Sequence, residues 1–224
     1  MKTPLRHLPI LLLTAVLALV ACDKQEDIDR AYTDYRYDIV TYLGKNATGA
    51  VFEYLGHGDS ASVMLQSHVA LKDVATNQRV LLRYDFADNN TASASRDIDV
   101  FGCNRIISDT VSLAELPPSE LPRQQVKLRS MWRTGRYINL HCLVEYTGKD
   151  RTFRLEADPQ TIDNDTVDCY LVHDLRGASA GWWRDCYASF DVAPLWDKQS
   201  FKCMRLHIVD ITYPNREYYY FNKQ

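Results

Sequence analysis

The clearest pattern in the sequence is an alternation of apolar and polar residues with a period of two. In residues 137–146 the apolar positions would share one face of a strand, while Asn139, His141 and Glu145 are expected to point to water. The apolar positions are Ile138, Leu140, Cys142, Val144 and Tyr146. Similar patterns predict further strands over residues 125–132, 152–157, 166–173, 186–192, 201–213 and 217–221. Seven strands at this spacing predict an antiparallel β-sandwich.

The first half of the chain shows shorter apolar runs separated by turn-forming residues. Glycine-rich segments at residues 44–49 and 56–59 are typical of turns. The expected strands cover residues 37–43, 50–55, 62–69, 79–86 and 97–101. Five short strands in this length predict a small barrel. Since no segment has a convincing amphipathic helical pattern, the predicted fold class is all-β.

A proline-rich segment, residues 113–122, lies between the two patterns. Its sequence, LAELPPSELP, contains three prolines, which disfavour helix and central strand and stiffen the chain. We therefore expect a barrel domain over residues 36–112, a linker over 113–122 and a sandwich domain over 123–224.

The amino-terminal residues are typical of a secretory signal. Lys2 and Arg6 precede an apolar run at residues 8–20, which is shorter than the ~20 residues needed to span a bilayer. The tetrapeptide Leu-Val-Ala-Cys that ends at Cys22 resembles the bacterial lipobox. Residues 1–21 are thus expected to be removed and Cys22 to carry the acyl chains that anchor the protein to a membrane.

Residues 22–35 are expected to form an acidic tether. Their acidic start is similar to the export signal of surface-exposed lipoproteins of the Bacteroidota, but it can equally be a simple spacer. The expected location is the outer membrane, with the periplasmic or surface face left open.

The charge of the chain argues against some partners. The formal net charge of −3 becomes more negative without residues 1–21, because they carry Lys2 and Arg6 and no acidic residue. Such a surface does not suggest nucleic-acid binding or electrostatic docking to anionic lipid.

The chain resembles the NigD-like lipoprotein family beyond the lipobox. The resemblance rests on segments in both halves: residues 79–84, 126–132, 137–140, 169–174, 190–192 and 218–221. It implies a barrel of the oligonucleotide/oligosaccharide-binding (OB) type followed by a β-sandwich. It implies no established activity and no catalytic residues, since the family's name reflects association with a bacteriocin locus. The chain departs from the family in its many cysteines and in a Gly-Trp-Trp loop.

Five cysteines follow Cys22, and none belongs to a CxxC pair of the kind that binds zinc or performs redox chemistry. They are Cys103, Cys142, Cys169, Cys186 and Cys203. Most lie within expected strands, where cysteine behaves as a small apolar residue. An exported protein can form disulfides. A bridge between the strands near Cys169 and Cys186 is one alternative, and at least one thiol is expected to stay free and buried.

The sequence contains no convincing catalytic or metal-binding set, so we expect neither an enzyme nor a cofactor. His57, Asp59 and His68 could share a metal, but nothing in the pattern fixes His57 against His68. His173 at the end of a strand is better explained as a structural imidazole than as a general base. No Gly-x-Ser-x-Gly elbow is present to expose a nucleophilic serine.

Aromatic residues are the most suggestive feature. Trp182 and Trp183, followed by Arg184, would point to opposite faces of a strand, so at least one ring can stand in solvent. These three residues are a candidate partner-contact patch, because exposed Trp and Arg often anchor protein or sugar partners. The alternative is that one ring packs in the core while the other covers the sheet edge.

Three short segments resemble the O-glycosylation motif of Bacteroidota envelope proteins. Each has an aspartate before a hydroxyl residue, and the candidate acceptors are Ser60, Thr110 and Thr166.

The expected function is that of a non-enzymatic envelope lipoprotein that binds or protects, with an immunity-like role implied by the resemblance alone. The alternative is a glycan- or peptide-binding accessory lipoprotein of an outer-membrane uptake system. An envelope protein or a glycan is therefore the expected partner.

Overall fold

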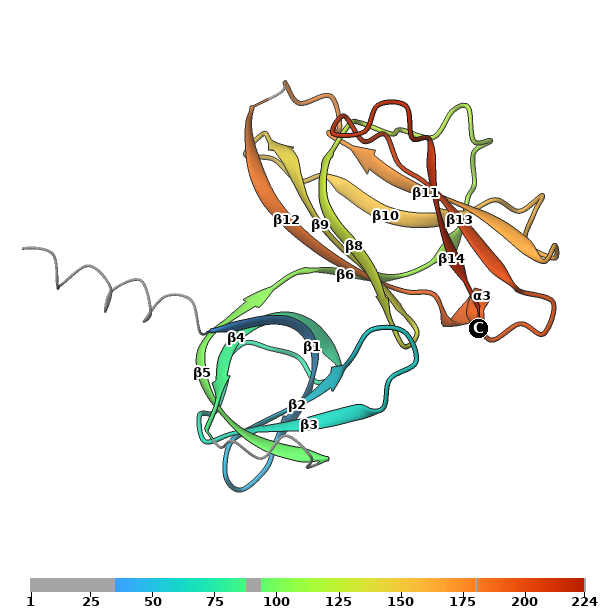
Figure 1. Ribbon diagram of the computed structural model, residues 1–224. Coiled ribbons are helices and arrows are strands. Elements are labelled where there is room, and N and C mark those ends of the chain that lie inside the picture. Colours follow the sequence, from blue (N-terminus) through green and yellow to red (C-terminus); the bar gives the residue numbers. More distant parts are fainter. Residues whose placement is uncertain (1–34, 88–93, 180, 224) are drawn as a thin grey trace, which may run out of the picture. The chain divides into compact units, whose positions relative to one another are not determined.

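A computed structural model describes residues 35–87, 94–179 and 181–223 (Figure 1). Residues 37–224 form one compact unit, while residues 1–36 form another, of which only Tyr35 and Arg36 are described. Cys22 and most of the expected tether therefore lie outside the described residues. Within the described part of the chain, no helix is long and apolar enough to cross a membrane.

The first five strands close into a barrel in the order β1-β2-β3-β5-β4. The bounds are β1 (Arg36–Lys45), β2 (Ala50–Leu55), β3 (Ser62–Ser67), β4 (Gln78–Phe86) and β5 (Ser95–Arg105). β2 pairs antiparallel with both β1 and β3, and β4 pairs antiparallel with β5, whereas β3 and β5 pair in parallel. A small closed barrel of five strands is the arrangement expected for an OB-type fold.

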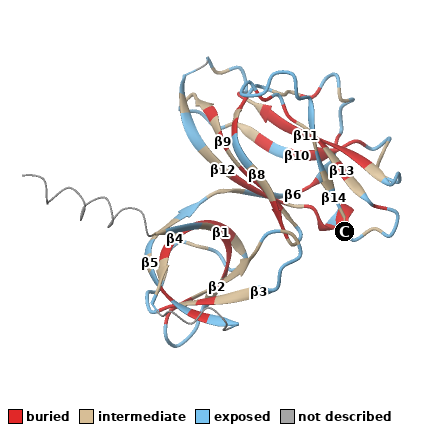
Figure 2. Cartoon of the chain, viewed as in Figure 1, coloured by how far each residue is buried: buried red, intermediate tan, exposed pale blue. Residues whose placement is uncertain are grey.

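The barrel core is filled by alternate side chains of its strands. Phe52, Leu65, Leu82 and Ile98 are essentially inaccessible to solvent, and Tyr42 packs its ring against Phe52 at a centroid distance of 5.6 Å. The buried positions on the strands are visible in Figure 2. The β-branched and aromatic runs predicted as strands thus fill this interior because alternate positions face inward.

The remaining strands form two sheets. The five-stranded sheet has the order β14-β13-β11-β10-β7 and the four-stranded sheet the order β6-β12-β9-β8. The bounds are β6 (Ile107–Thr110), β7 (Ser112–Leu113), β8 (Lys127–Thr134), β9 (Tyr137–Tyr146), β10 (Thr152–Ala157), β11 (Thr166–Asp174), β12 (Trp182–Asp191), β13 (Cys203–His207) and β14 (Tyr218–Asn222). A single short helix, α3 (Ala193–Trp196), appears among the described residues. The all-β prediction is confirmed.

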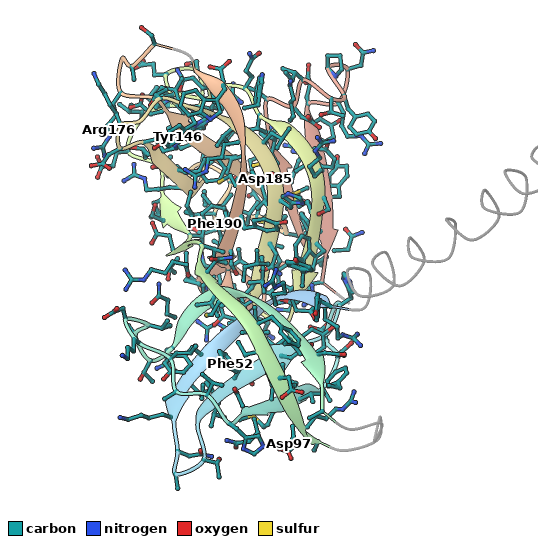
Figure 3. All side chains as sticks on the ribbon, turned by 90° about the vertical axis from the view of Figure 1, so that its left-hand side faces the viewer. Phe52, Asp97, Tyr146, Arg176, Asp185 and Phe190 are labelled. Atoms are coloured by element: carbon teal, nitrogen blue, oxygen red, sulfur yellow. The ribbon has the colours of Figure 1, made fainter. Side chains whose placement is uncertain are left out.

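One continuous apolar core draws on both of these sheets. Leu140 and Phe190 from the four-stranded sheet belong to it, as do Leu155, Leu171 and Leu206 from the five-stranded sheet. Figure 3 shows Phe190 on this part of the chain and Phe52 on the barrel strands. The two sheets therefore bury one face each, as in a β-sandwich.

The proline-rich segment differs from the expected linker. β7 pairs in parallel with β10, and β6 pairs in parallel with β12, so residues 107–113 already belong to the sandwich sheets. Leu121 and Ala114 then pack on Val172 of β11. The segment is held to the outside of the five-stranded sheet because Ala114 and Leu121 are buried there. The division into separately folding domains stays a prediction.

The strand predicted over residues 201–213 is too long. β13 ends at His207, and Asp210 holds the following turn by accepting hydrogen bonds from the backbone N–H groups of Leu128 (3.1 Å) and Thr212 (2.9 Å). The expected strand at residues 186–192 is, conversely, too short, since β12 begins at Trp182.

The expectation that Asn139 points to water is wrong. Asn139 is completely buried, and Arg79 of β4 donates from Nη2 to its Oδ1 at 3.2 Å. Arg79 is itself buried and also donates to Thr41 Oγ1 (3.0 Å) and Ser189 Oγ (3.1 Å), while its guanidinium lies 4.2 Å from the centre of the Tyr137 ring. Burial lowers the pKa of Arg79 to about 10, although nearby acidic groups oppose the change. This network links barrel strands to the four-stranded sheet.

Candidate binding surfaces

The outer face of the five-stranded sheet carries a row of rings that sequence reasoning missed. Alternation along β13 and β14 sends Met204, Leu206, Tyr219 and Phe221 to the core. The intervening positions point outward and, with Tyr170 of β11, form a surface that we name the tyrosine–histidine face. Its members are Arg123, Tyr170, Arg205, His207, Tyr218 and Tyr220.

The rings of this face contact one another in sequence. His207 stacks on Tyr170 with centroids 4.5 Å apart and planes 17° apart. Tyr218 meets His207 edge to face at 5.7 Å, and Tyr220 meets Tyr218 at 5.3 Å. Tyr218 is 39% exposed and Tyr220 is 55% exposed. The outer end of the row is therefore open to solvent, as suits a contact surface.

A buried carboxylate positions the row. Asp168 accepts hydrogen bonds from His207 Nε2 at 2.7 Å and from Arg205 Nη2 at 2.6 Å, and it also accepts from Arg205 Nε. Burial alone would raise the pKa of Asp168, but these hydrogen bonds outweigh it and hold the pKa below its usual value. The carboxylate thus stays ionised and fixes both the imidazole and the guanidinium beneath the tyrosines.

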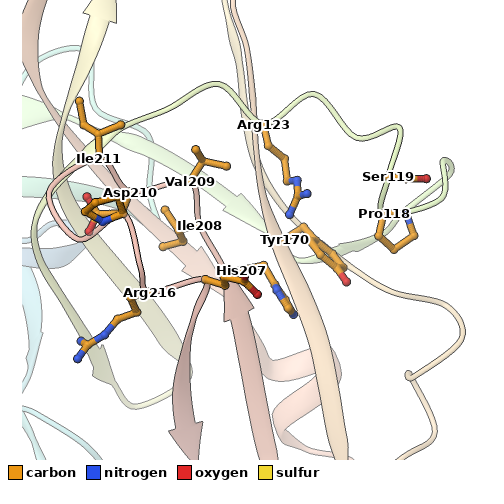
Figure 4. Close-up of a pocket in the computed structure, with 12 residues that line it drawn as sticks. Pro118, Ser119, Arg123, Tyr170, His207, Ile208, Val209, Asp210, Ile211 and Arg216 are labelled. Atoms are coloured by element: carbon orange, nitrogen blue, oxygen red, sulfur yellow. The ribbon is translucent and has the colours of Figure 1, made fainter.

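A cavity of about 530 Å³ opens beside this row (Figure 4). Arg123 and Tyr170 point toward one another on one wall, with the guanidinium 5.3 Å from the ring centre. His207 lies next to Tyr170, and the loop that contains Arg216 forms another part of the lining. The cavity therefore combines aromatic surface with cationic and hydrogen-bonding groups, which are common features of ligand sites.

A second surface contains the tryptophans predicted from the sequence. Trp182 is 68% exposed, and its ring lies 5.1 Å from that of Tyr146, its register partner on β9. Arg184 places its guanidinium 5.0 Å from the centre of the same tyrosine ring. Trp182, Arg184 and Tyr146 therefore form an aromatic and cationic group, which we name the tryptophan end.

Trp183 lies on the opposite side of the sheet from Trp182. It is half-buried, and Lys127 Nζ lies 4.1 Å from its ring centre. The close approach of β12 to β9 requires Gly181, because a Cβ there would lie 1.8 Å from the Tyr146 carbonyl oxygen. The three residues predicted as one patch are thus adjacent in sequence but split between two faces, as alternation requires. Their role in partner binding stays a prediction.

The candidate glycosylation residues are placed differently from one another. Ser60 and Thr110 are exposed, whereas Thr166 is half-buried at the start of β11. Ser60 Oγ donates to the His57 carbonyl oxygen at 2.7 Å. Modification of these residues stays a prediction.

Asp59, one of the residues considered for a metal site, is paired with an arginine. Both carboxylate oxygens of Asp59 accept hydrogen bonds from Arg133, at 2.6 and 2.7 Å. The Arg133 hydrogen bond, the largest cause, lowers the pKa of Asp59 although burial opposes it. In the part of the chain that the structure describes, no group of three or more His, Cys, Asp or Glu side chains is arranged to hold a metal.

The cysteine expectation needs a correction. All five cysteines within the described ranges carry free thiols. Cys169 lies on β11 of one sheet and Cys186 on β12 of the other, and Cys186 is instead directly opposite Cys142 of β9. A pairing of Cys169 with Cys186 is therefore wrong. The expected free and buried thiol is present in Cys169.

A five-stranded barrel followed by a two-sheet sandwich defines the fold class of this protein. No family model matches the chain, and no curated protein matches its sequence. Solved structures with a similar fold include proteins from several Bacteroides species. A protein of unknown function from Bacteroides vulgatus has a TM-score of 0.66 at 13% identity, covering 85% of this chain and 91% of that chain.

Two further structures match to a similar extent. A NigD-like immunity protein from Bacteroides caccae has a TM-score of 0.60 at 16% identity, covering 86% of this chain and 99% of that one. A proposed lipoprotein from Bacteroides fragilis has a TM-score of 0.59 at 11% identity, with coverage of 85% and 98%. The NigD-like resemblance seen in the sequence is thus confirmed at the level of the fold.

Proposed function

We propose that the protein is a non-enzymatic binding lipoprotein of the cell envelope that engages a protein partner through its aromatic surfaces. The observation that carries this proposal is the exposed row of Tyr218 and Tyr220 above the fixed Arg205. Tyrosine, tryptophan and arginine are the residues that contribute most to protein interfaces. A preorganised row loses little conformational entropy on binding, because the ring contacts and Asp168 already order it.

The immunity-like form of this function draws on the fold that the chain shares with the Bacteroides caccae protein. Such a role needs a surface for a protein partner, and both the tyrosine–histidine face and the tryptophan end offer one. On this proposal the partner is another envelope protein.

The envelope location is proposed from the lipobox that ends at Cys22, and the fold shared with a proposed lipoprotein is consistent with it. We place the mature protein at the outer membrane, held by acyl chains on Cys22. Two or more chains are needed for stable anchoring, since each buried CH₂ contributes about 0.8 kcal/mol.

The anchor is tested by expressing Cys22→Ala in the native host, with Cys103→Ala as the matched control. Cys22→Ala is expected to leave the membrane fraction, while Cys103→Ala stays in it and mass spectrometry finds acyl chains on its Cys22. Membrane fractionation of Cys22→Ala at the wild-type level would refute the anchor.

The partner is tested by photo-crosslinking in intact cells. Tyr220→p-benzoylphenylalanine should give a discrete adduct with one envelope protein, and that adduct should vanish when Arg205→Ala is added. The same replacement at Tyr37, which is 57% exposed on the barrel, serves as control. Identical adducts from both positions, or none from Tyr220, would contradict the proposal.

A glycan is the second candidate ligand, and the cavity beside Tyr170 favours it. Arg123 and His207 flank that ring, so polar groups and an aromatic surface converge in about 530 Å³. The test is binding of isolated glycans by the purified protein. Binding that is abolished by Tyr170→Ala together with His207→Ala would support this candidate over a protein partner.

A further inference from the structure

Cys142 and Cys186 form a cross-strand pair in the core of the sandwich. They are register partners on the antiparallel strands β9 and β12, and both belong to the same face as Leu140 and Phe190. Side chains at directly opposite positions of an antiparallel pair are close neighbours on the same face of the sheet, so the two thiols lie next to each other. Two sulfurs are thus held together by the sheet itself.

The backbone geometry of such a pair suits a disulfide. Residues directly opposite in an antiparallel sheet have Cα atoms about 4.5–5.5 Å apart. Disulfides join cysteines whose Cα atoms are about 4.4–6.8 Å apart. A bond between Cys142 and Cys186 therefore needs only a small approach of the two Cβ atoms and no rearrangement of the strands.

The other cysteines lack such a partner. Cys103 is on the barrel strand β5, and the register of β11 with β13 sets Cys169 opposite Leu206 and Cys203 opposite Thr166. On β13 the core positions are Met204 and Leu206, so Cys203 points to the other face. Among the cysteines that the structure describes, only Cys142 and Cys186 lie directly opposite each other on paired strands.

The two thiols also differ in a way that suits stepwise oxidation. Cys142 is completely buried, whereas Cys186 is half-buried. The hydrogen bond from Cys142 lowers the pKa of Cys186 despite burial, and the positive charge of Arg151 acts in the same direction. The same pairing raises the pKa of Cys142. The thiolate, which is the reactive form, is therefore favoured on the more accessible sulfur.

We propose that Cys142 and Cys186 are a built-in oxidation site that closes to an intramolecular disulfide when the chain meets a disulfide oxidant. The Cys186 thiolate attacks one sulfur of the oxidant and forms a mixed disulfide with it. The other sulfur of the oxidant leaves as a thiol. Cys142 then loses its proton, attacks the Cys186 sulfur and releases the second thiol of the oxidant. Two electrons pass to the oxidant disulfide, which ends as two thiols.

The proposal is tested on the full-length chain in vitro, so its outcome does not depend on whether the protein is exported. The reduced protein is incubated with oxidised glutathione, the reaction is stopped with acid, the remaining thiols are alkylated with N-ethylmaleimide in denaturant near neutral pH, and the peptides are mapped by mass spectrometry without reduction. A linked Cys142–Cys186 peptide is expected, with Cys103, Cys169 and Cys203 largely alkylated. Alkylation of both Cys142 and Cys186, or a link from either one to another cysteine, would overturn the proposal.

Two variants test the order of the steps. Cys142→Ser should stop at the mixed disulfide on Cys186, visible as a glutathione adduct on that peptide. Cys203→Ser is the matched control and should keep the linked peptide. Reduction of the closed form should lower the melting temperature of the wild type and of Cys203→Ser by on the order of 10 °C, because the bond closes a loop of more than 40 residues. A Cys142→Ser protein without the adduct would contradict the assigned attacking thiol.

Discussion

Arg79 and Ser189 are 110 positions apart in the sequence, yet Arg79 Nε donates a hydrogen bond to Ser189 Oγ at 3.1 Å. Ser189 Oγ in turn donates to Asn139 Oδ1 at 2.8 Å, and Asn139 Nδ2 donates to Thr134 Oγ1 at 2.9 Å. The buried guanidinium of Arg79 is thus stabilised by hydrogen bonds to neutral oxygens of the barrel and of the four-stranded sheet. This arrangement makes each acceptor important for stability, since an unpaired buried cation is expensive.

The first prediction concerns Asn139. Asn139→Ala removes an acceptor of both Arg79 and Ser189 in a fully buried place. We expect the free energy of unfolding to fall by about 3 kcal/mol, measured by urea denaturation. Glu145→Ala on the same strand is the control and should change it by less than about 0.5 kcal/mol. Equal effects of the two substitutions would show that the network does not stabilise the fold.

The second prediction contrasts neighbouring tyrosines of β14. Tyr219 packs against the core and donates from its hydroxyl to Asp210 at 2.9 Å, whereas Tyr220 is 55% exposed. Tyr219→Ala should therefore lower the free energy of unfolding by about 2–3 kcal/mol, and Tyr220→Ala by less than about 1 kcal/mol. Chemical denaturation of both variants tests this, and a larger loss in Tyr220→Ala would mean that the outward ring is structural.

The third prediction concerns pH. Burial lowers the pKa of His173, although its Nδ1 donates to the Gln124 carbonyl oxygen at 3.1 Å. In the described part of the structure, its buried Nε2 has no hydrogen-bond partner. A histidine with a folded-state pKa below the unfolded value of about 6.5 binds a proton more readily when unfolded. Its contribution to stability is therefore complete above pH 6.5 and declines as the pH falls below that value.

The measurement is the free energy of unfolding between pH 7.5 and pH 5. We expect His173→Gln to reduce the decline over this range, because the substitution removes the group that binds a proton more readily in the unfolded chain. His57→Gln, at an exposed position, should keep the wild-type slope. A wild-type slope in His173→Gln would assign the acid sensitivity to other groups.

The fourth prediction concerns a close approach of backbone in the barrel. A Cβ at Gly49 would lie 2.1 Å from the Ser67 carbonyl oxygen, so any side chain there must displace the chain. Gly49→Ala should destabilise the protein by about 2–3 kcal/mol. At Gly102 a Cβ would find its nearest neighbours, atoms of Arg83, at 3.8 Å. Gly102→Ala should thus be nearly neutral in thermal unfolding, and a similar shift in both variants would refute the steric argument.

The sequence by itself determined most of the strands. Residues 50–55, 137–146 and 152–157 match β2, β9 and β10, because alternation is a local property that any buried sheet face imposes. It also determined that Trp182 and Trp183 would separate to opposite faces of β12. The short strands β6 and β7 lacked this signal, since they are too short to show a period.

Tertiary structure alone decided which polar residues are buried and which rings meet. Asn139 has the pattern of a solvated position, but Arg79 from a distant strand covers it. His207 and Tyr170 are 37 residues apart and stack only because β11 and β13 pair in parallel. Strand order and register bring such residues together, and neither can be read from a local pattern, because each depends on the free energy of packing the whole chain.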